Sequence, residues 1–155
     1  MNGVFRGSYT ARIDDKGRLK LPATFKAQLE AKYGLALFVT SVDGDSVLIY
    51  PKSVWEAHER AVVGEGELMA LDPSRRNYLT RVNFHGQESE ADSQGRVVIQ
   101  PRLRESAEMS GEVSVIGRYN YLEVWNFGRL KQRLEEAPFT DDDARSLVGT
   151  PPKPE

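Results

Sequence analysis

The amino-acid sequence predicts a mainly β protein with short helices, a β+α fold built from two pseudo-symmetric halves. Each half is expected to run strand–turn–strand, short helix, strand–turn–strand (ββαββ). The prediction rests on a motif that recurs about half a chain length later and on alternating apolar and polar residues beside each copy. The length of 155 residues suits one compact domain or two very small ones fused.

The internal repeat is clearest in two loops. Residues 14–21 (DDKGRLKL) recur as residues 92–99 (DSQGRVVI), with the Asp, the Gly and the Arg identical. The similarity continues in the same order through an apolar run, a second apolar run and an amphipathic helical stretch. Because the motif, both apolar runs and the helical stretch recur in the same order, the repeat indicates a duplication rather than a chance match of one motif.

The first hairpin of each half follows from local patterns. Residues 9–13 alternate, residues 14–17 carry turn-forming types, and residues 19–21 alternate again. Gly17 in this copy and Gly95 in the other stand where a tight turn favours a positive φ. The repeated loop is therefore expected to join two strands.

A short helix and a second hairpin complete each half. Pro22 and Pro101 end a strand and suit the first turn of a helix. Asp43 and Gly44 predict the turn of the second hairpin in the first half. The expected strands of the second hairpins are residues 37–40 and 47–50 in the first half and residues 113–116 and 122–125 in the second.

Helices are expected to link the halves, and an irregular tail to end the chain. Ser53 to Glu56 form a capping-box pattern that predicts a helix start. Asp72-Pro73 predicts a second helix start, and the acidic, proline-rich sequence after Pro138 predicts disorder. The expected parts are an N-terminal half at 5–55, linking helices at 56–83, a C-terminal half at 84–136 and a disordered tail at 137–155.

Composition excludes several kinds of site. The chain has no cysteine and two histidines, so a disulfide framework, a thiolate metal site, a cysteine nucleophile and a histidine-rich metal centre are not expected. No stretch resembles a signal peptide or approaches the roughly 18 apolar residues of a membrane span. A cytoplasmic protein without membrane contact is the simplest interpretation.

The charge is unevenly distributed along the chain. The net charge is -2 and the sequence pI is near 5.8, which at first sight argues against nucleic acid as a partner. Residues 1–26, however, hold six basic side chains against two acidic ones. Such asymmetry indicates an anion-binding face, and a merely solvated strand face is the alternative. The six basic residues are Arg6, Arg12, Lys16, Arg18, Lys20 and Lys26.

The repeated Asp-x-x-Gly-Arg loop has two interpretations. In the structural one, the Asp accepts backbone N–H bonds or pairs with the Arg across the hairpin. In the functional one, the loop presents the Arg to phosphates and base edges, because a guanidinium can bind guanine or phosphate bidentately. Duplication of the loop, with additional Lys and Arg around the first copy, favours binding.

These residues together resemble the MraZ family. The resemblance is carried by Phe5-Arg6-Gly7, by residues 13–22, by residues 92–99 and by Leu48-Ile49-Tyr50-Pro51 followed by Trp55, and it extends from about Phe5 to about Leu134. It implies two tandem AbrB-type swapped-hairpin halves that form a double-split β-barrel with helices. It also implies a cytoplasmic, nucleoid-associated repressor of the division and cell-wall gene cluster, including its own operon.

The resemblance further implies the partners and the contacting residues. The partners are double-stranded DNA carrying repeated promoter boxes and further copies of the chain in a ring-shaped homo-oligomer; no cofactor, metal or catalytic residue is expected. The second loop has Gln94 in place of Lys16 and is flanked by Glu88 and Glu90, so its contact is expected to be weaker. The candidate DNA-binding residues are Arg6, Arg12, Asp14, Lys16, Gly17, Arg18, Lys20, Asp92, Gly95 and Arg96.

Two other functions stay open at this point. A metal-dependent nuclease could use Asp14, Asp15 and Asp92, although neighbouring Arg and Lys compete for these carboxylates. An antitoxin of the same swapped-hairpin superfamily would bind both DNA and a toxin protein. Cleavage of DNA lost in Asp14→Ala would favour the first, and co-purification with a small neighbouring-gene product the second.

Overall fold

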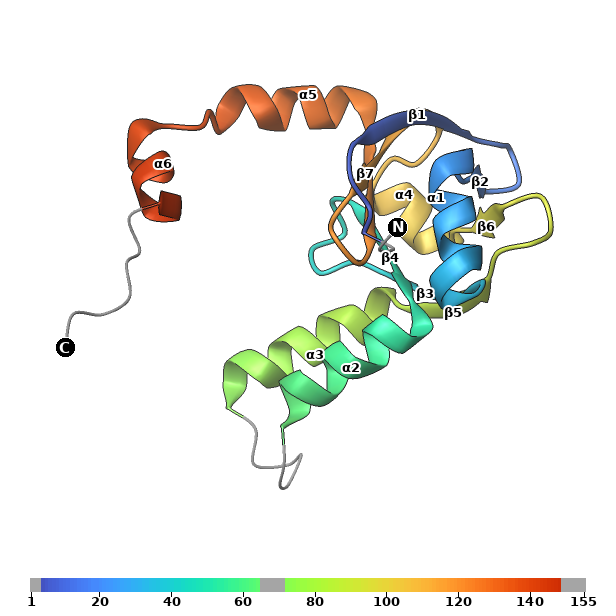
Figure 1. The fold of residues 1–155 in the computed structure, drawn as a ribbon, viewed down its shortest axis with the longest axis horizontal. Helices are drawn as coiled ribbons and strands as arrows, with labels where there is room; N and C mark the ends of the chain where they lie inside the picture. Colours follow the sequence, from blue (N-terminus) through green and yellow to red (C-terminus); the bar gives the residue numbers. More distant parts are fainter. Residues whose placement is uncertain (1–3, 65–71, 149–155) are drawn as a thin grey trace.

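The fold is an eight-stranded antiparallel sheet that curls into a nearly closed barrel, seen at the right of Figure 1. This computed structural model describes residues 4–64 and 72–148. The strands are β1 (Ser8–Ile13), β2 (Arg18–Lys20), β3 (Ala36–Thr40), β4 (Val47–Pro51), β5 (Gln87–Glu90), β6 (Arg96–Val98), β7 (Gly111–Gly117) and β8 (Leu122–Asn126). Their order is β5-β3-β4-β8-β7-β1-β2-β6. The expected β-barrel with short helices, built from two similar halves, is confirmed.

The helices are short and follow the hairpins. They are α1 (Ala23–Gln28) with a π-helical turn η1 (Leu29–Tyr33), α2 (Lys52–Val63), α3 (Pro73–His85), α4 (Pro101–Ser106), α5 (Phe127–Glu136) and α6 (Asp141–Val148). Pro22 is the N-cap of α1 and Pro101 the first residue of α4, as the sequence predicts. In the part of the chain that the structure describes, no helix is long and apolar enough to cross a membrane.

The two halves exchange strands. β1 of the first half pairs along its whole length with β7 of the second, and β3 of the first half pairs with β5 of the second. The exchange is centred on the pair Leu19 and Val97, which are opposite each other where β2 meets β6. Each half therefore completes the other, and neither forms a sheet of its own.

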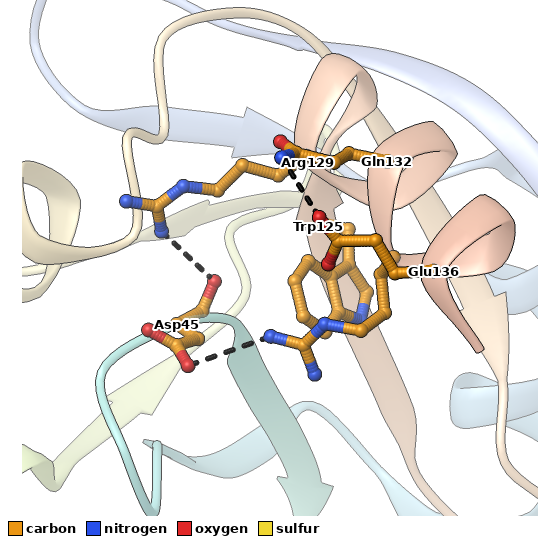
Figure 2. A pocket seen from close by; sticks show the side chains of 6 residues that line it. Asp45, Trp125, Arg129, Gln132 and Glu136 are labelled. Atoms are coloured by element: carbon orange, nitrogen blue, oxygen red, sulfur yellow. Dashed lines mark hydrogen bonds and ion pairs between the residues drawn. The ribbon is translucent and has the colours of Figure 1, made fainter.

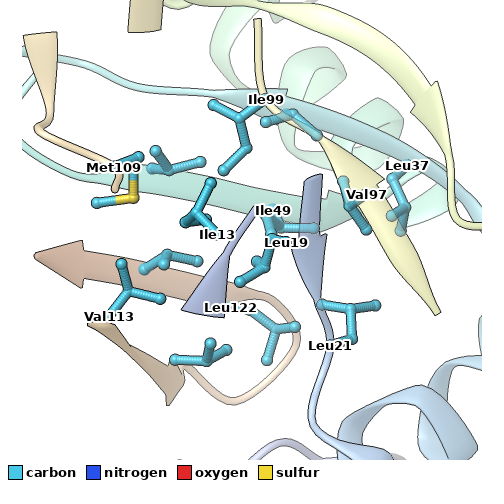
Figure 3. Close-up of a cluster of buried hydrophobic side chains, with 14 of the residues drawn as sticks. Ile13, Leu19, Leu21, Leu37, Ile49, Val97, Ile99, Met109, Val113 and Leu122 are labelled. Carbon is cyan, nitrogen blue, oxygen red and sulfur yellow. The ribbon is translucent and has the colours of Figure 1, made fainter. Parts of the chain in front are cut away.

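One apolar core fills the barrel. Strands β2 and β6 bury only their central residue, whereas β4 and β7 each hold a run of three buried residues. Phe25 of α1 and Leu103 of α4, which the repeat places in equivalent positions, are both fully buried. Figure 3 shows part of this cluster, including Ile13, Leu19, Leu21, Leu37, Ile49, Val97, Ile99, Met109, Val113 and Leu122.

Helices α2 and α3 lie side by side as a hairpin that projects from the barrel (Figure 1). Trp55 of α2 and Val82 of α3 pack with Tyr50 in a second, smaller cluster. The expected capping box is wrong: α2 begins at Lys52, before Ser53, and no side chain caps it. The expected start at Asp72 is confirmed, because its carboxylate accepts the N–H of Arg75 at 2.8 Å.

The C-terminal segment contains more order than the sequence predicts. Within the expected tail, residues Asp141–Val148 form α6, whose first turn holds three acidic residues. The proline-rich end of the expected tail, residues 151–154, lies outside the described residues. The division of the chain at residues 55, 83 and 136 stays a prediction.

Candidate nucleic-acid interface

The repeated loop is a turn held together by its aspartate. Asp14 Oδ1 accepts the backbone N–H of Lys16 at 2.9 Å and that of Arg18 at 2.8 Å, and Oδ2 accepts Arg18 Nε at 2.8 Å. In the second copy, Asp92 makes the same three bonds to Gln94 and Arg96, with the same lengths. The structural and the functional interpretations of the motif are thus compatible, since the bonds that form the turn also fix the arginine.

The carboxylates in both turns are stabilised in their ionised form. The backbone N–H bond from Arg18 lowers the pKa of Asp14 most, outweighing the opposing effect of desolvation, and the Arg18 side chain and the Lys16 N–H add to it. The pKa of Asp92 is lowered by the same contacts from Arg96 and Gln94. Both aspartates therefore act on a ligand through the arginine that they orient.

The arginine of each turn keeps its outer nitrogens available. Asp14 engages only Nε of Arg18, and among the described residues neither Nη group of Arg18 has a hydrogen-bond partner. The Arg18 side chain is 32% exposed and that of Arg96 31% exposed. Two fixed Nη groups are what a bidentate contact to a guanine edge or a phosphate requires.

Each loop is docked against the helix of the other half. Gly17 has φ +78°, and a Cβ there would lie 2.4 Å from Arg104 Nε in α4. Gly95 has φ +80°, and a Cβ there would lie 2.7 Å from Lys26 Cδ in α1. These positions require glycine both for the backbone conformation and for the close approach. Reciprocal backbone bonds join the loops: Leu21 N donates to Gly95 O at 2.8 Å, and Ile99 N donates to Gly17 O at 3.0 Å.

Strands β2 and β6 form a two-stranded ribbon with a basic outer face, which we call the basic ribbon (Arg18, Lys20, Arg96 and Val98). The central residues Leu19 and Val97 point inward and are fully buried, so their neighbours along each strand point outward. Lys20 is directly opposite Arg96, which places Arg18 diagonal to Arg96, about 7–8 Å apart between Cα atoms. The pairing thus brings both motif arginines onto one face.

The other candidate residues lie at different distances from this ribbon. Lys16 is exposed in the first turn, next to Arg18. Arg12 is near the loop but lies directly opposite Glu112 of β7, an acidic neighbour that reduces its attraction for an anion. Arg6 precedes β1, whose six residues separate it from the loop by about 20 Å, and it belongs to the opposite end of the barrel.

Two basic residues beside the loops were not among the candidates. Arg104 lies over Gly17 and donates from Nε to Ile99 O at 3.0 Å, and Lys26 lies over Gly95 and pairs with Glu30 at 3.1 Å. The repeat aligns Lys26 with Arg104, which is a sequence signal that both have the same role. Their contact with the opposite loop is a consequence of the strand exchange and has no signal in the sequence.

The two edges of the interface differ in charge. The repeat aligns Arg12, Lys16 and Lys20 of the first copy with Glu90, Gln94 and Val98 of the second. Glu88, which also flanks the second loop, is 3.6 Å from Lys52 Nζ. The first loop is therefore the more basic of two geometrically equivalent loops.

The geometry argues against a metal site in these loops. Both carboxylate oxygens of Asp14, and both of Asp92, already accept hydrogen bonds within their own turns. Across residues 4–64 and 72–148, no cluster of three His, Asp or Glu side chains is arranged to hold a metal ion.

Comparisons with known proteins agree with the duplicated architecture. The family model of the MraZ protein, whose description likens it to antitoxins, matches residues 4–67 and 84–149. The chain is 43% identical over 145 residues to the transcriptional regulator MraZ of Acidobacterium capsulatum, covering 94% of this chain and 97% of that protein. It is 45% identical to the transcriptional regulator MraZ of Koribacter versatilis, covering 93% and 97%. The transcriptional regulator MraZ of a Mycobacterium species is 32% identical, with 94% and 100% covered.

Proposed function

This chain belongs to the MraZ family of transcriptional regulators, and we propose that it binds double-stranded DNA sequence-specifically through the basic ribbon. The observation that carries the proposal is the pair of turns in which Asp14 and Asp92 fix Arg18 and Arg96 on one outer face. An arginine held in place loses less side-chain entropy on binding than a free one, so its contact is stronger.

The dimensions of the ribbon suit the major groove. The major groove is about 12 Å wide and admits a two-stranded β-ribbon. Arg18 and Arg96 are about 7–8 Å apart on the diagonal, which corresponds to about two base steps of 3.4 Å. We therefore expect the two arginines to contact bases two steps apart, with the Leu19–Val97 pair above the step between them.

Lysines around the ribbon would supply the contacts that do not depend on sequence. Lys16 and Lys20 are exposed beside Arg18, and each phosphate neutralised makes binding more sensitive to salt. Because the second loop has Gln94 and Val98 at the aligned positions, most phosphate contacts are expected on the side of the first loop.

Repression would follow from the binding of several copies of the chain to one promoter. A single ribbon neutralises few phosphates and binds weakly, whereas several copies in a ring that engage repeated boxes gain avidity. We infer from the family resemblance that the boxes lie in the promoter of the division and cell-wall gene cluster, which includes the protein's own operon. The bound ring would block that promoter in the cytoplasm, on the nucleoid.

A gel-shift titration with the chain's own upstream region tests the proposal. Arg18→Ala and Arg96→Ala are each expected to lose about 1–3 kcal/mol of discrimination, or roughly 5- to 150-fold, against a scrambled DNA. Arg6→Ala is the matched control, because it removes the same charge at the other end of β1 and should leave discrimination unchanged. Full sequence-specific binding by Arg18→Ala would refute the assignment.

The antitoxin function remains a second candidate, because the description of the matching family likens it to antitoxins. It would add a toxin protein as a partner without changing the basic ribbon. Co-expression with the neighbouring genes, followed by purification of the chain at high salt, tests it. A small protein retained in constant proportion would support an antitoxin function.

A further inference from the structure

One residue on the outer face of the basic ribbon is apolar. Val98 is 48% exposed, whereas the other three residues of that face are cations. Of the large apolar side chains that the described ranges leave exposed, Val98 is the only aliphatic one in a strand. It belongs to neither of the two apolar clusters, so the packing of the barrel does not account for its chemistry.

Val98 lies directly beside the motif arginine of the first loop. It is opposite Arg18 in the pairing of β2 with β6. The adjacent pair, Gly17 and Ile99, is hydrogen-bonded, because Ile99 N donates to Gly17 O at 3.0 Å. Hydrogen-bonded and non-hydrogen-bonded pairs alternate along an antiparallel ladder. Arg18 and Val98 therefore form a non-hydrogen-bonded pair, in which the Cα atoms are about 4.5 Å apart and the side chains are close together.

The side chain of Arg18 does not stand at full length above that of Val98. The carboxylate of Asp14 lies against the backbone of the turn, because its Oδ1 accepts the N–H of Lys16 at 2.9 Å. Arg18 Nε is held 2.8 Å from Oδ2 of the same carboxylate. The guanidinium is thereby kept near the backbone, so a base edge that it contacts also comes close to the shorter side chain of Val98.

Another group of arginines lies at the start of α5, but each of these arginines already uses an outer nitrogen. Arg129 donates from Nη1 to the carbonyl of Asp45 at 3.4 Å, as Figure 2 shows. Arg133 has Nη2 3.6 Å from the Asp45 carboxylate. Arg18 differs, because Asp14 engages it through Nε and leaves its Nη groups without a hydrogen-bond partner among the described residues. The exposed valine thus lies beside the arginine that is available to a ligand.

The two arginines of the basic ribbon have different neighbours. Arg18 is opposite Val98, and Arg96 is opposite Lys20. Both arginines are held in the same way by the aspartate of their own loop, so the difference lies in the neighbours. The first pair presents a cationic fork beside an apolar group, whereas the second presents two cations.

The chemistry of Val98 restricts what it can contact on DNA. Its side chain has no donor or acceptor, so a phosphate or a polar base group that it covers is left without a partner, which costs free energy. In the major groove the base pairs present donors, acceptors and one apolar group, the C5-methyl of thymine. This methyl is the group that Val98 can cover without such a cost.

We propose that Val98 reads the C5-methyl group of a thymine next to the guanine that Arg18 contacts. The proposal rests on the proposed function, since it requires the basic ribbon to lie in the major groove. Directly opposite residues have Cβ atoms about 4.5–5.5 Å apart, which is more than one base step of about 3.4 Å and less than two. The thymine is therefore the immediate neighbour of that guanine, and Val98 is a specificity-determining residue.

Replacing a thymine by uracil removes this methyl group and nothing else. Gel-shift titrations with the chain's own upstream region, in which one thymine at a time is replaced by deoxyuridine, test the proposal. The wild type should bind about fourfold more weakly when the contacted thymine is replaced, which is the equivalent of about 0.8 kcal/mol for one buried methyl group. Val98→Ala should bind the unmodified DNA about fourfold more weakly and should not respond to that replacement.

Lys20→Ala is the matched control, because it truncates the side chain at the equivalent position of β2 on the same face. It should weaken binding to every DNA alike and keep the response to uracil. Unrelated DNA should bind Val98→Ala as tightly as the wild type, which shows that the variant is folded. The position of the thymine is a second check: it should lie next to the base pair at which Arg18→Ala relaxes specificity.

The outcomes separate the role of Val98 from the proposed function. Sequence-specific binding that depends on Arg18 but responds to no uracil would overturn the role of Val98 alone. A uracil response that Val98→Ala retains in full, or a thymine away from the base pair read by Arg18, would do the same. Full discrimination by Arg18→Ala would instead overturn the proposed function, and the assignment of Val98 with it.

Discussion

Gly17 is the residue whose substitution tests most directly how the first loop is positioned. Gly17→Ala places a methyl group 2.4 Å from Arg104 Nε while the backbone has φ +78°. The side chain of Arg104 must move, which breaks its 3.0 Å bond to the Ile99 carbonyl. We therefore expect the substitution to lower stability in two ways: it strains the turn itself, and it disrupts the contact of the turn with the other half.

The expected loss of stability is the sum of these two contributions. A non-glycine residue in the left-handed region costs about 1–2 kcal/mol. Loss of the Arg104 bond costs about 0.5–1.5 kcal/mol. Gly17→Ala should thus lower the free energy of unfolding by about 1.5–3.5 kcal/mol. Gly7→Ala, at φ +87° with nothing within 4 Å of the added Cβ, should show only the first part.

Urea unfolding at one fixed protein concentration measures both variants. Adding Arg104→Ala to the wild type and to each glycine variant completes a double-mutant cycle. In that cycle, the Arg104 substitution should cost less in the Gly17→Ala variant than in the wild type, because the Arg104 bond is already lost there. DNA discrimination should also fall in Gly17→Ala and stay unchanged in Gly7→Ala. Equal destabilisation by the two glycine variants would refute the docking of the loop on Arg104.

Three further predictions concern charge and packing. Val98→Lys restores the residue type of Lys20 to the second strand; it should strengthen binding to all unrelated DNA sequences alike and steepen the salt dependence by about one unit, measured by anisotropy at several salt concentrations. The pKa of Asp14 and of Asp92 is lowered on folding, so their stabilising effect is present above the ordinary value of 3.8 and is lost as the pH falls through the lower, folded-state value. The stability advantage of the wild type over an Asp14→Asn, Asp92→Asn double variant should therefore shrink as the pH falls below 3.8, and an advantage that grows with falling pH would contradict the direction of the pKa shift. Leu19→Ala, fully buried at the centre of the strand exchange, should cost about 2–5 kcal/mol in urea unfolding, whereas Lys20→Ala beside it should change stability little.

Most of the elements could be predicted from local sequence. Alternation, the Pro22 and Pro101 helix starts, and the Asp43-Gly44 turn all correspond to observed features, because each depends on neighbours in the chain. The capping box at Ser53 failed for a related reason: Pro51, two residues earlier, already fixes the backbone for a helix start.

Strand exchange and the three-dimensional distribution of charge could not be predicted in the same way. The pairing of β1 with β7 joins residues far apart in the sequence, and no local pattern encodes it. Counting charges along the chain grouped Arg6 with Arg18, yet β1 separates them, while Arg104 from the other half lies against the loop of Arg18. The duplicated motif indicated the arginines, and only the fold places them on one face.

The strand exchange also determines the point during synthesis at which the barrel can form. Ser8 pairs with Ile116, so β1 waits for nearly three-quarters of the chain before β7, the neighbour with which all six of its residues pair, emerges from the ribosome. At about 5–20 residues per second, that wait is on the order of 5–20 s. A polypeptide that ends before β6 contains the first Asp-x-x-Gly-Arg sequence but lacks the strand that pairs with β2 and carries Arg96. If the basic ribbon binds DNA as proposed, we expect specific binding only from chains synthesised at least through β8, the last strand of the barrel.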